Sequence, residues 1–244
     1  MNNINIENII KRFREMRLPI MAEELLNIIE TGELSSLKTI EVLERLSSEE
    51  YISRKNNTIN RLKKRAKLSQ AGARLEEIDY SPERQINRSV IEQLMTNNYI
   101  RDHRNVVLLG ACGTGKSYIS NALGNHACES SYTTYYCRIF EFLSECHQEY
   151  DLTQTITRVI KQYSKYDVLI IDDFLMTSVQ EREAQNIFQL LEYRYGTKTT
   201  IVCSQLEPVE WHRNLGGNII ADSILDRIIP NAYELVLYGE SNRK

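Results

Sequence analysis

Eight consecutive residues have the composition of a phosphate-binding loop. They match the pattern Gly-x-x-x-x-Gly-Lys-Ser, in which backbone amides surround the phosphates of a nucleotide. We expect the Lys116 ammonium to contact the β- and γ-phosphates and the Ser117 hydroxyl to ligate magnesium. An apolar stretch precedes the loop and a helical segment follows it, so an incidental glycine-rich turn is the weaker interpretation. The remaining residues predicted to bind the nucleotide are Gly110, Cys112, Gly113, Thr114, Gly115 and Tyr118.

Two adjacent carboxylates, Asp172 and Asp173, follow the apolar stretch 168–171. If that stretch is a strand of an open α/β sheet, both acids emerge in the crevice where such sheets bind ligands. We assign Asp172 to the magnesium ion and Asp173 to the attacking water. The alternative is a turn or a helix cap, and the position of the pair downstream of the phosphate loop argues against it.

Two further polar residues could take part in phosphoryl transfer. Gln205 follows the apolar stretch 199–203, where its side chain could reach the γ-phosphate and the attacking water. Arg227 lies between a helical segment and the last expected strand. It could not easily reach the nucleotide of its own chain, but it could stabilise charge at the nucleotide of a neighbouring subunit. A surface salt bridge with Asp222 or Asp226 is the alternative for Arg227.

From Asn105 onward, short β-branched or aromatic stretches alternate with helical segments. This alternation predicts a parallel sheet covered by helices on both faces. A helix is expected from Lys116 to about Ser130. The expected strands cover residues 106–109, 133–136, 167–171, 199–203 and 232–237.

The first hundred or so residues have helical periodicity instead. Pro19 interrupts the first apolar series, Ser36 could cap a longer helix, and Ser81-Pro82 marks a further break. We therefore expect a small all-α domain over residues 1–98 and an α/β domain over residues 99–244.

A basic stretch lies at the C-terminal end of the longer helical segment. From Arg54 to Arg74 there are eight Lys or Arg and no Asp or Glu, although the net charge of the whole chain is −3. So many cations repel one another unless a polyanion lies nearby, which favours contact with a nucleic-acid backbone over a solvated helix face. The residues predicted to contact DNA here are Arg61, Lys63, Lys64, Arg65 and Lys67.

Composition excludes several other classes. Hydrophobic residues make up 42% and charged residues 26% of 244, as in ordinary globular proteins. Five cysteines without a Cys-x-x-Cys pair, and four histidines without ligand spacing, argue against a disulfide framework and a zinc site. The apolar stretches are too short for a membrane span and no signal peptide is recognised, so we expect a cytoplasmic location.

Signatures spread over nearly the whole chain resemble the IstB family. Besides the phosphate loop and Asp172-Asp173, they comprise residues 16–22, 64–68, 203–206 with Trp211-His212, 220–227 and 239–244. The resemblance implies a P-loop AAA+ ATPase of the initiator and helicase-loader branch, related to DnaC, with ATP and Mg²⁺ as cofactors. It also implies a homo-oligomer that assembles on duplex DNA with ATP, deforms the DNA and recruits the transposase of an insertion sequence. The absence of a guanine-binding Asn-Lys-x-Asp stretch likewise favours ATP.

The resemblance adds three residues to the predicted sites. The segment 138–166 is similar in position to the extra helices through which this branch touches DNA, with Lys161 and Lys165 as candidate contacts and surface solvation as an equal alternative. Many relatives have Glu where this chain has Asp173, so hydrolysis could be slow. Because few residues follow the last expected strand, we expect no helical lid here, and Arg243 could replace the sensor arginine of that lid or belong to a disordered terminus.

Two other functions stay open. One is a DnaC-like loader, whose partners would be a hexameric helicase and single-stranded DNA. The other is a nucleotide-binding interaction module that hardly hydrolyses ATP. Subunit number, target preference, transposase contacts and the extent of DNA bending cannot be read from the sequence.

Overall fold

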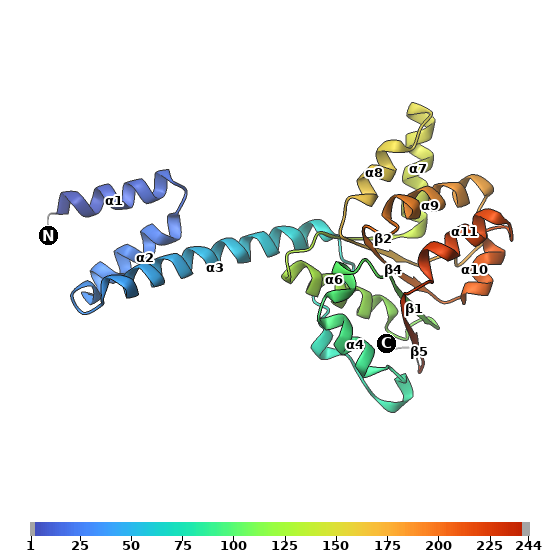
Figure 1. The fold of residues 1–244 in the computed structure, drawn as a ribbon, viewed down its shortest axis with the longest axis horizontal. Helices are drawn as coiled ribbons and strands as arrows, with labels where there is room; N and C mark the ends of the chain where they lie inside the picture. Colours follow the sequence, from blue (N-terminus) through green and yellow to red (C-terminus); the bar gives the residue numbers. More distant parts are fainter. Residues whose placement is uncertain (1–2, 241–244) are drawn as a thin grey trace. The chain divides into compact units, whose positions relative to one another are not determined.

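The computed structural model describes residues 3–240 (Figure 1). The chain divides into two compact units, the first ending at Arg61 and the second beginning at Leu62. The first unit contains helices α1 (Asn3–Glu15) and α2 (Pro19–Glu30) and most of α3 (Thr39–Ala66). The helical character of this region is confirmed.

A buried carboxylate fastens two helices of the first unit together. Glu50 of α3 accepts hydrogen bonds from the backbone N–H groups of Ile20 and Met21, at 3.0 and 3.2 Å. These donors lie in the first turn of α2, which starts at Pro19, the residue that interrupts the first apolar series, and leaves its early N–H groups without helical partners. Ser36, expected to cap α3, instead donates to the carbonyl of Glu33 in the short 3₁₀ helix Glu33–Ser35. The prediction of that cap was wrong, and α3 begins three residues later.

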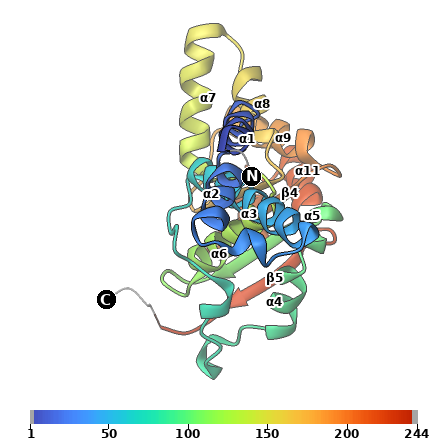
Figure 2. The same cartoon turned by 90° about the vertical axis from the view of Figure 1, so that its left-hand side faces the viewer.

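The second unit is built on a five-stranded parallel sheet in the order β2-β3-β4-β1-β5. Strands β4 and β5 of this sheet are labelled in Figure 2. All five strands lie within a residue or two of the stretches expected from the sequence. Their bounds are β1 Val106–Gly110, β2 Thr134–Arg138, β3 Val168–Asp172, β4 Thr199–Ser204 and β5 Tyr233–Leu237.

Helices cover both faces of this sheet, which confirms the predicted three-layer α/β architecture. Alternation along β1 sends Val107 and Leu109 into one hydrophobic core and Val106 and Leu108 into the other. The first core is covered by α7 (Ile139–Thr153), α8 (Thr157–Ser164), α9 (Glu181–Arg194), α10 (Pro208–Asn214) and α11 (Ile219–Ile228). The second is covered by α6 (Lys116–Glu129), α4 (Arg88–Met95) and α5 (Asn98–Arg101).

Residues 68–100 belong to the second unit and not to the helical unit before it. Two short 3₁₀ helices, Leu75–Glu77 and Pro82–Arg84, lead into α4. Leu75, Ile91 and Tyr99 are buried in the same core as strand residues of the sheet. The division at Arg61 therefore lies well before the boundary at residue 98 that the sequence suggests, because this segment buries its apolar side chains against the sheet.

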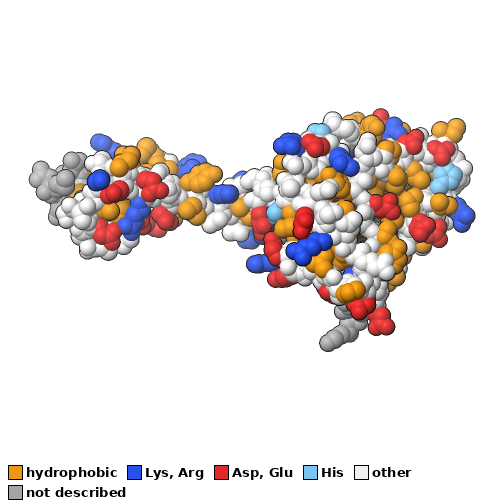
Figure 3. All heavy atoms as spheres, turned by 60° about the horizontal axis from the view of Figure 1, so that its bottom comes forward, with side chains coloured by type: hydrophobic (Ala, Val, Ile, Leu, Met, Phe, Trp, Pro, Cys, Tyr) orange, Lys and Arg blue, Asp and Glu red, His pale blue; other side chains and the backbone are white. Residues whose placement is uncertain are grey.

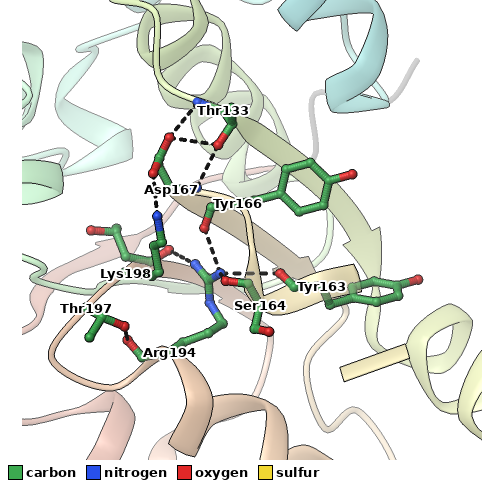
Figure 4. Close-up of polar contacts among 9 residues, drawn as sticks. Thr133, Tyr163, Ser164, Tyr166, Asp167, Arg194, Thr197 and Lys198 are labelled. Carbon is green, nitrogen blue, oxygen red and sulfur yellow. Dashed lines mark hydrogen bonds and ion pairs between the residues drawn. The ribbon is translucent and has the colours of Figure 1, made fainter. Parts of the chain in front are cut away.

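A buried guanidinium connects three elements on the other face of the sheet (Figure 4). Arg194, at the end of α9, is 1% exposed. Its Nε donates to the Thr200 hydroxyl at 3.0 Å, and one terminal nitrogen donates to the Tyr166 carbonyl at 2.8 Å. The other terminal nitrogen donates to the carbonyl of Thr199. This one side chain thereby ties α9 to the start of β4 and to the turn between α8 and β3.

We expect Arg194→Met to destabilise the second unit by about 3 kcal/mol or more, because several buried carbonyls lose their donor at once. Urea unfolding followed by the fluorescence of Trp211 measures this, since Trp211 is the one tryptophan of the chain and is buried in the second unit. The matched control is Arg213→Met at an exposed position, expected to change stability by about 0.5 kcal/mol or less. Equal changes in the free energy of unfolding for the two substitutions would show that Arg194 stabilises the second unit no more than an exposed arginine does.

Candidate nucleotide site and basic groove

The phosphate loop connects β1 to α6 and passes very close to the last strand. Gly110 has a φ of +145°, and a Cβ built on it would lie 2.3 Å from the carbonyl oxygen of Leu237. No other residue type fits there without moving β5. Gly113 and Gly115 also have positive φ, at 82° and 104°, which lets the loop curve into the N-terminus of α6.

The loop and two strand ends enclose a cavity of about 260 Å³. Most of the residues predicted from separate motifs meet here, on the carboxyl side of the parallel strands. Gly110 and Thr114 shape the loop without lining the cavity, and Thr114 donates through its hydroxyl to the Ala111 carbonyl at 2.9 Å. The lining residues are Gln70, Cys112, Gly113, Gly115, Lys116, Ser117, Tyr118, Asp172, Asp173 and Gln205.

Lys116 is a largely desolvated ammonium at the head of α6. Its Nζ donates to the carbonyls of Gly110 and Ala111, both at 2.7 Å. Burial lowers the pKa of Lys116, while Cys203 and Asp172 act in the opposite direction. Because neutral carbonyls compensate a buried cation poorly, phosphate oxygens in this cavity would be strong acceptors for the same ammonium.

The two carboxylates at the end of β3 differ in environment. Asp172 is buried, with one oxygen accepting from the Tyr136 hydroxyl at 2.8 Å and the other from the backbone N–H of Asp173 at 2.9 Å. Asp173 has a left-handed backbone with φ of 54° and a side chain that is 44% exposed. An oxygen of Asp173 lies 3.6 Å from Nε of Arg138, the last residue of β2. Asp172 is thus held in place, while Asp173 faces solvent and a cation.

The oxygen donors of this cavity suit a magnesium ion that arrives with its nucleotide. Among residues 3–240, no group of three or more His, Cys, Asp or Glu side chains could hold a metal alone. Mg²⁺ typically takes only one or two protein ligands beside phosphate oxygens and water. The Ser117 hydroxyl and the Asp172 carboxylate, both lining the cavity, meet that requirement.

The end of β4 places one polar side chain toward the cavity and one away from it. Ser204 is buried, donates to the carbonyl of Phe174 at 2.8 Å and accepts from the Trp211 indole N–H at 2.9 Å. Gln205 lines the cavity. The geometry is consistent with the choice of Gln205, because the hydroxyl of the neighbouring Ser204 is bonded within the core.

One lining residue, Gln70, was not predicted. It lies within the basic stretch and reaches the cavity because residues 67–73 run along α6, where Asn121 accepts the backbone N–H of Gln70 at 3.1 Å. No motif marks such a residue, since its place depends on a contact between residues 51 positions apart.

Arg227, in α11, does not line the nucleotide cavity. It lines a separate cavity of about 440 Å³ together with Asp102, Arg194 and Asn231. Its Nε pairs with Glu192, and its guanidinium lies 4.6 Å from the ring centre of Phe188. The acidic partner is therefore Glu192, and neither Asp222 nor Asp226 forms a described ion pair with Arg227. Arg243 lies outside the described residues.

A second predicted set meets in a groove of about 820 Å³, which we call the basic groove. The groove lies beside β2 at the edge of the sheet, and none of the described residues that line it is acidic. On the face of the second unit visible in Figure 3, by contrast, basic and acidic side chains are interspersed. The lining residues are Leu62, Lys64, Arg65, Lys67, Thr133, Thr134, Tyr135, Arg158, Lys161, Gln162, Lys165 and Tyr166.

Two predicted DNA contacts lie elsewhere. Lys63 pairs with Glu129 at 2.7 Å and does not line the groove. Arg61 is the last residue of the first unit. Arg158, which was not predicted, lines the groove but pairs with the buried Glu149. The five cations of the groove that form no described ion pair are Lys64, Arg65, Lys67, Lys161 and Lys165.

Aromatic rings lie among these cations. Tyr135 and Tyr166 stack with ring centres 4.8 Å apart, and Lys67 Nζ lies 5.3 Å from the centre of the Tyr135 ring. Lys165 Nζ lies 5.1 Å from the centre of the Tyr166 ring. The basic groove thus has positively charged walls around an aromatic pair.

No helix within residues 3–240 is both long and apolar enough to cross a lipid bilayer.

Known proteins share this chain's sequence and fold. The chain is 29% identical to the insertion sequence ATP-binding protein y4uH of Sinorhizobium fredii, over 95% of this chain and 92% of that one. It is 30% identical to y4pL of the same organism, over 96% and 94% of the two chains. The ATP-binding protein of insertion sequence IS232 from Bacillus thuringiensis is 25% identical over 93% of this chain and 90% of its own length.

Solved structures share the fold at lower identity. DnaI has a TM-score of 0.56 at 19% identity, covering 70% of this chain and 91% of that one. The DnaC helicase loader has a TM-score of 0.54 at 16% identity, covering 68% and 96%. The replication initiator DnaA bound to AMPPCP and single-stranded DNA has a TM-score of 0.53 at 21% identity, and the match spans about half (49%) of the DnaA chain. These similarities support a P-loop AAA+ fold for the second unit.

A family model described as IstB-like ATP binding protein matches residues 11–244, and the full-length relatives are ATP-binding proteins of insertion sequences; the chain therefore belongs to the IstB-like family.

Proposed function

We propose that this protein is a Mg²⁺-dependent ATPase that binds duplex DNA as an oligomer and assists the transposase of an insertion sequence. The observation that carries the proposal is the meeting of the phosphate loop, both strand-end carboxylates and Gln205 around one cavity. Family membership supports ATP as the nucleotide. The insertion-sequence context of the relatives supports the transposase as a partner.

In the proposed reaction, water attacks the γ-phosphorus and the bond to the bridging oxygen of ADP breaks. Ser117 and Asp172 would hold the magnesium ion, which would supply neutralisation of the phosphate charge when bound. Lys116 would stabilise the transferred phosphoryl group. Asp173 accepts the proton of the water, and Gln205 orients the water. Asp173 lines the cavity, but one of its oxygens also lies 3.6 Å from Nε of Arg138, and this competing contact supports slow hydrolysis.

The basic groove is the proposed DNA contact of the second unit. Five cations around one groove, with no described acidic residue lining it, would neutralise phosphates without reading bases. Lys161 and Lys165 on or next to α8 thereby join the groove cations at the end of α3. Lys63 and Arg61 are proposed only as secondary contacts, given their places outside the groove.

Arg227 is proposed to act on the nucleotide of a neighbouring subunit. It lies outside the cavity of its own chain, at a distinct cavity. Its pairing with Glu192 must break for the guanidinium to reach a phosphate. The assembled oligomer would then contain composite active sites.

A DnaC-like helicase loader is the second candidate. The observation that favours it is the similarity of the fold to DnaC and DnaI. Copurification with a hexameric helicase and a preference for single-stranded over duplex DNA would support it.

A weakly hydrolysing nucleotide-binding module is the third candidate, since Asp173 is shorter than glutamate and lies beside Arg138.

We expect Lys116→Ala to weaken ATP binding at least about tenfold, because the phosphates lose the buried ammonium that lines the cavity. Asp173→Asn should leave ATP affinity nearly unchanged and lower the hydrolysis rate by about 100-fold or more, as expected for loss of a general base. Fluorescent-nucleotide titration and steady-state phosphate release measure the two quantities. Unchanged hydrolysis in Asp173→Asn would remove this residue from the reaction, whereas negligible hydrolysis already in the wild type would favour the third candidate.

Neutralising two groove cations by Lys161→Gln and Lys165→Gln should weaken duplex binding equally for unrelated sequences. The slope of log K against log salt should fall by about two, because two phosphate contacts are lost. The matched control is the exposed pair Arg101→Gln and Arg213→Gln, expected to leave the slope unchanged. A slope that does not differ between the two double variants would exclude the groove as the DNA contact.

Light scattering after size-exclusion chromatography tests the assembly. With duplex DNA, ATP and Mg²⁺ the protein should form a large nucleoprotein oligomer that is absent when ATP is omitted.

Arg227→Ala should retain ATP binding by the isolated subunit but lower the rate of ATP hydrolysis in the oligomer at least about 100-fold. Wild-type turnover in an Arg227→Ala oligomer would rule out the composite active site.

A further inference from the structure

The nucleotide cavity supplies little positive charge for a nucleoside triphosphate. Its lining contains one ammonium, Lys116, and two carboxylates, Asp172 and Asp173. Arg138, whose Nε lies 3.6 Å from Asp173, brings the site only to neutrality. A triphosphate carries more negative charge than one magnesium ion neutralises, and that charge must be stabilised during phosphoryl transfer. Part of the charge on a bound ATP is therefore left for cations from outside this chain.

The cavity of about 440 Å³ that contains Arg227 has the opposite imbalance. Of the described residues that line it, four are Lys or Arg and one, Asp102, is acidic. The lining also includes Asn105, Thr200 and Asn231, which lie at or just before the first residues of β1, β4 and β5. An excess of positive charge thus lies at the amino ends of the strands, while the nucleotide cavity lies at their carboxyl ends.

The four cations of this cavity differ in how they are compensated. Lys198 pairs with Asp167 at 2.6 Å (Figure 4), and Arg227 pairs with an acidic residue of α9. Arg194 is buried and donates to five neutral oxygens, which saturate its guanidinium. Arg104 forms no ion pair with any residue of the described range 3–240. It is therefore the cation of this cavity that is available to an incoming anion.

Neutral groups hold the half-buried Arg104 in one orientation. Its Nε donates to the carbonyl of Asn231 at 2.7 Å, and one terminal nitrogen donates to the Tyr233 hydroxyl at 3.1 Å. The guanidinium carbon lies 4.0 Å from the centre of the Tyr233 ring. No described residue accepts a hydrogen bond from the other terminal nitrogen. A guanidinium that is stacked on a ring and keeps donors free is well suited to phosphate oxygens.

The residue after Arg104 fixes its position relative to Arg227. The Nδ2 of Asn105 donates to the carbonyls of Arg227 and Ile228 at 2.8 and 3.2 Å. The Oδ1 of Asn105 accepts the backbone N–H of Thr200 at 3.0 Å. The end of α11 is thereby tied to the start of β1 and to β4. Both arginines consequently line one cavity from elements whose spacing is held by hydrogen bonds.

We propose that Arg104 is a second cation that acts between subunits: together with Arg227 of the same subunit, it binds phosphate oxygens of the ATP held by a neighbouring copy. The two cavities lie at opposite ends of the parallel strands, so a head-to-tail contact between copies brings one against the other. The positive charge of one cavity then faces the uncompensated negative charge of the other. Arg104 reaches the phosphates without breaking an ion pair, whereas Arg227 must leave Glu192. The inference rests on the proposed function, because it takes Arg227 to act on the neighbour's nucleotide.

Arg104→Gln tests the contact, because glutamine removes the charge but can still donate to the Asn231 carbonyl. With duplex DNA, Mg²⁺ and AMPPNP, light scattering should show half-assembly at a protein concentration at least about tenfold above that of the wild type. At concentrations that give full assembly, the rate of ATP hydrolysis should fall at least about tenfold, because a cation near the transferred phosphoryl group is lost. Arg104→Lys keeps the charge and should recover part of both quantities. The matched control is Arg101→Gln, at an exposed position outside the cavity, which should behave as the wild type.

Mixed oligomers distinguish action between subunits from a structural role. Asp173→Asn subunits are expected to bind ATP without hydrolysing it and to present both intact arginines to a neighbour. An equal mixture of Arg104→Gln and Asp173→Asn should therefore hydrolyse ATP faster than the sum of the separate variants, as should a mixture of Arg227→Ala and Asp173→Asn. A mixture of Arg104→Gln and Arg227→Ala should show no such gain, because neither subunit presents both arginines.

The outcomes separate the inference from the proposed function. Wild-type assembly and turnover of Arg104→Gln would overturn the inference. If Asp173→Asn subunits restore turnover to Arg227→Ala but not to Arg104→Gln, Arg104 acts within its own subunit, the inference is wrong and the proposed function stands. Weakened assembly with wild-type turnover of the assembled oligomer would place an acidic side chain of the neighbour in the cavity instead of a phosphate. If neither variant is restored, the composite active site of the proposed function fails and the inference fails with it.

Discussion

The close approach of the phosphate loop to the last strand is the constraint on which the nucleotide site depends. Gly110 leaves β1 so near the carbonyl of Leu237 that a Cβ would overlap it. The loop therefore forms where β1 runs close beside β5, and β4 lies on the other side of β1. That arrangement also determines where Gln205 and Asp172 emerge, because parallel strands end at a common edge. The sheet order and the active-site geometry are thus consequences of the same packing.

Each charged side chain of the nucleotide site is stabilised by its particular neighbours, and the charges are not simply paired one to one. Lys116 is buried against carbonyls, Asp172 is held by a tyrosine hydroxyl, and Asp173 lies near Arg138. These neighbours bind the charged side chains more weakly than would the phosphate oxygens or the metal ion that replace them. Binding of Mg²⁺ and ATP would therefore redistribute these contacts, and the residues that lose a partner determine which elements respond.

Local patterns in the sequence were sufficient for the strands, the phosphate loop and the paired acids. All five strands and the helix after the loop match their predicted positions. Their apolar and β-branched runs, bounded by glycine and charged residues, are local patterns that predict secondary structure without knowledge of tertiary contacts. The prediction of the Ser36 cap was wrong, because the serine bonds locally to Glu33, and the division at Arg61 differs from the boundary predicted at residue 98. Gln70 in the nucleotide cavity and Glu192 beside Arg227 were not predicted, because both depend on tertiary contacts that no local pattern contains, as with Gln70 and Asn121. The catalytic and DNA-binding roles remain predictions that the geometry supports.

The basic groove shows why a charge run alone could not locate a binding surface. The sequence places eight cations along one stretch, yet the side chains of Lys63 and Lys64 diverge, one to Glu129 and the other to the groove. What assembles the groove is the packing of α8 beside β2, and Arg194 holds the turn that follows α8 through its bond to the Tyr166 carbonyl. Tyr166 in turn stacks on Tyr135, the neighbour of the tyrosine that contacts Asp172. Arg194, which has no proposed role in the reaction, thus supports the groove through Tyr166 and Tyr135. On β2, Tyr135 is adjacent to Tyr136, whose hydroxyl contacts the predicted magnesium ligand Asp172.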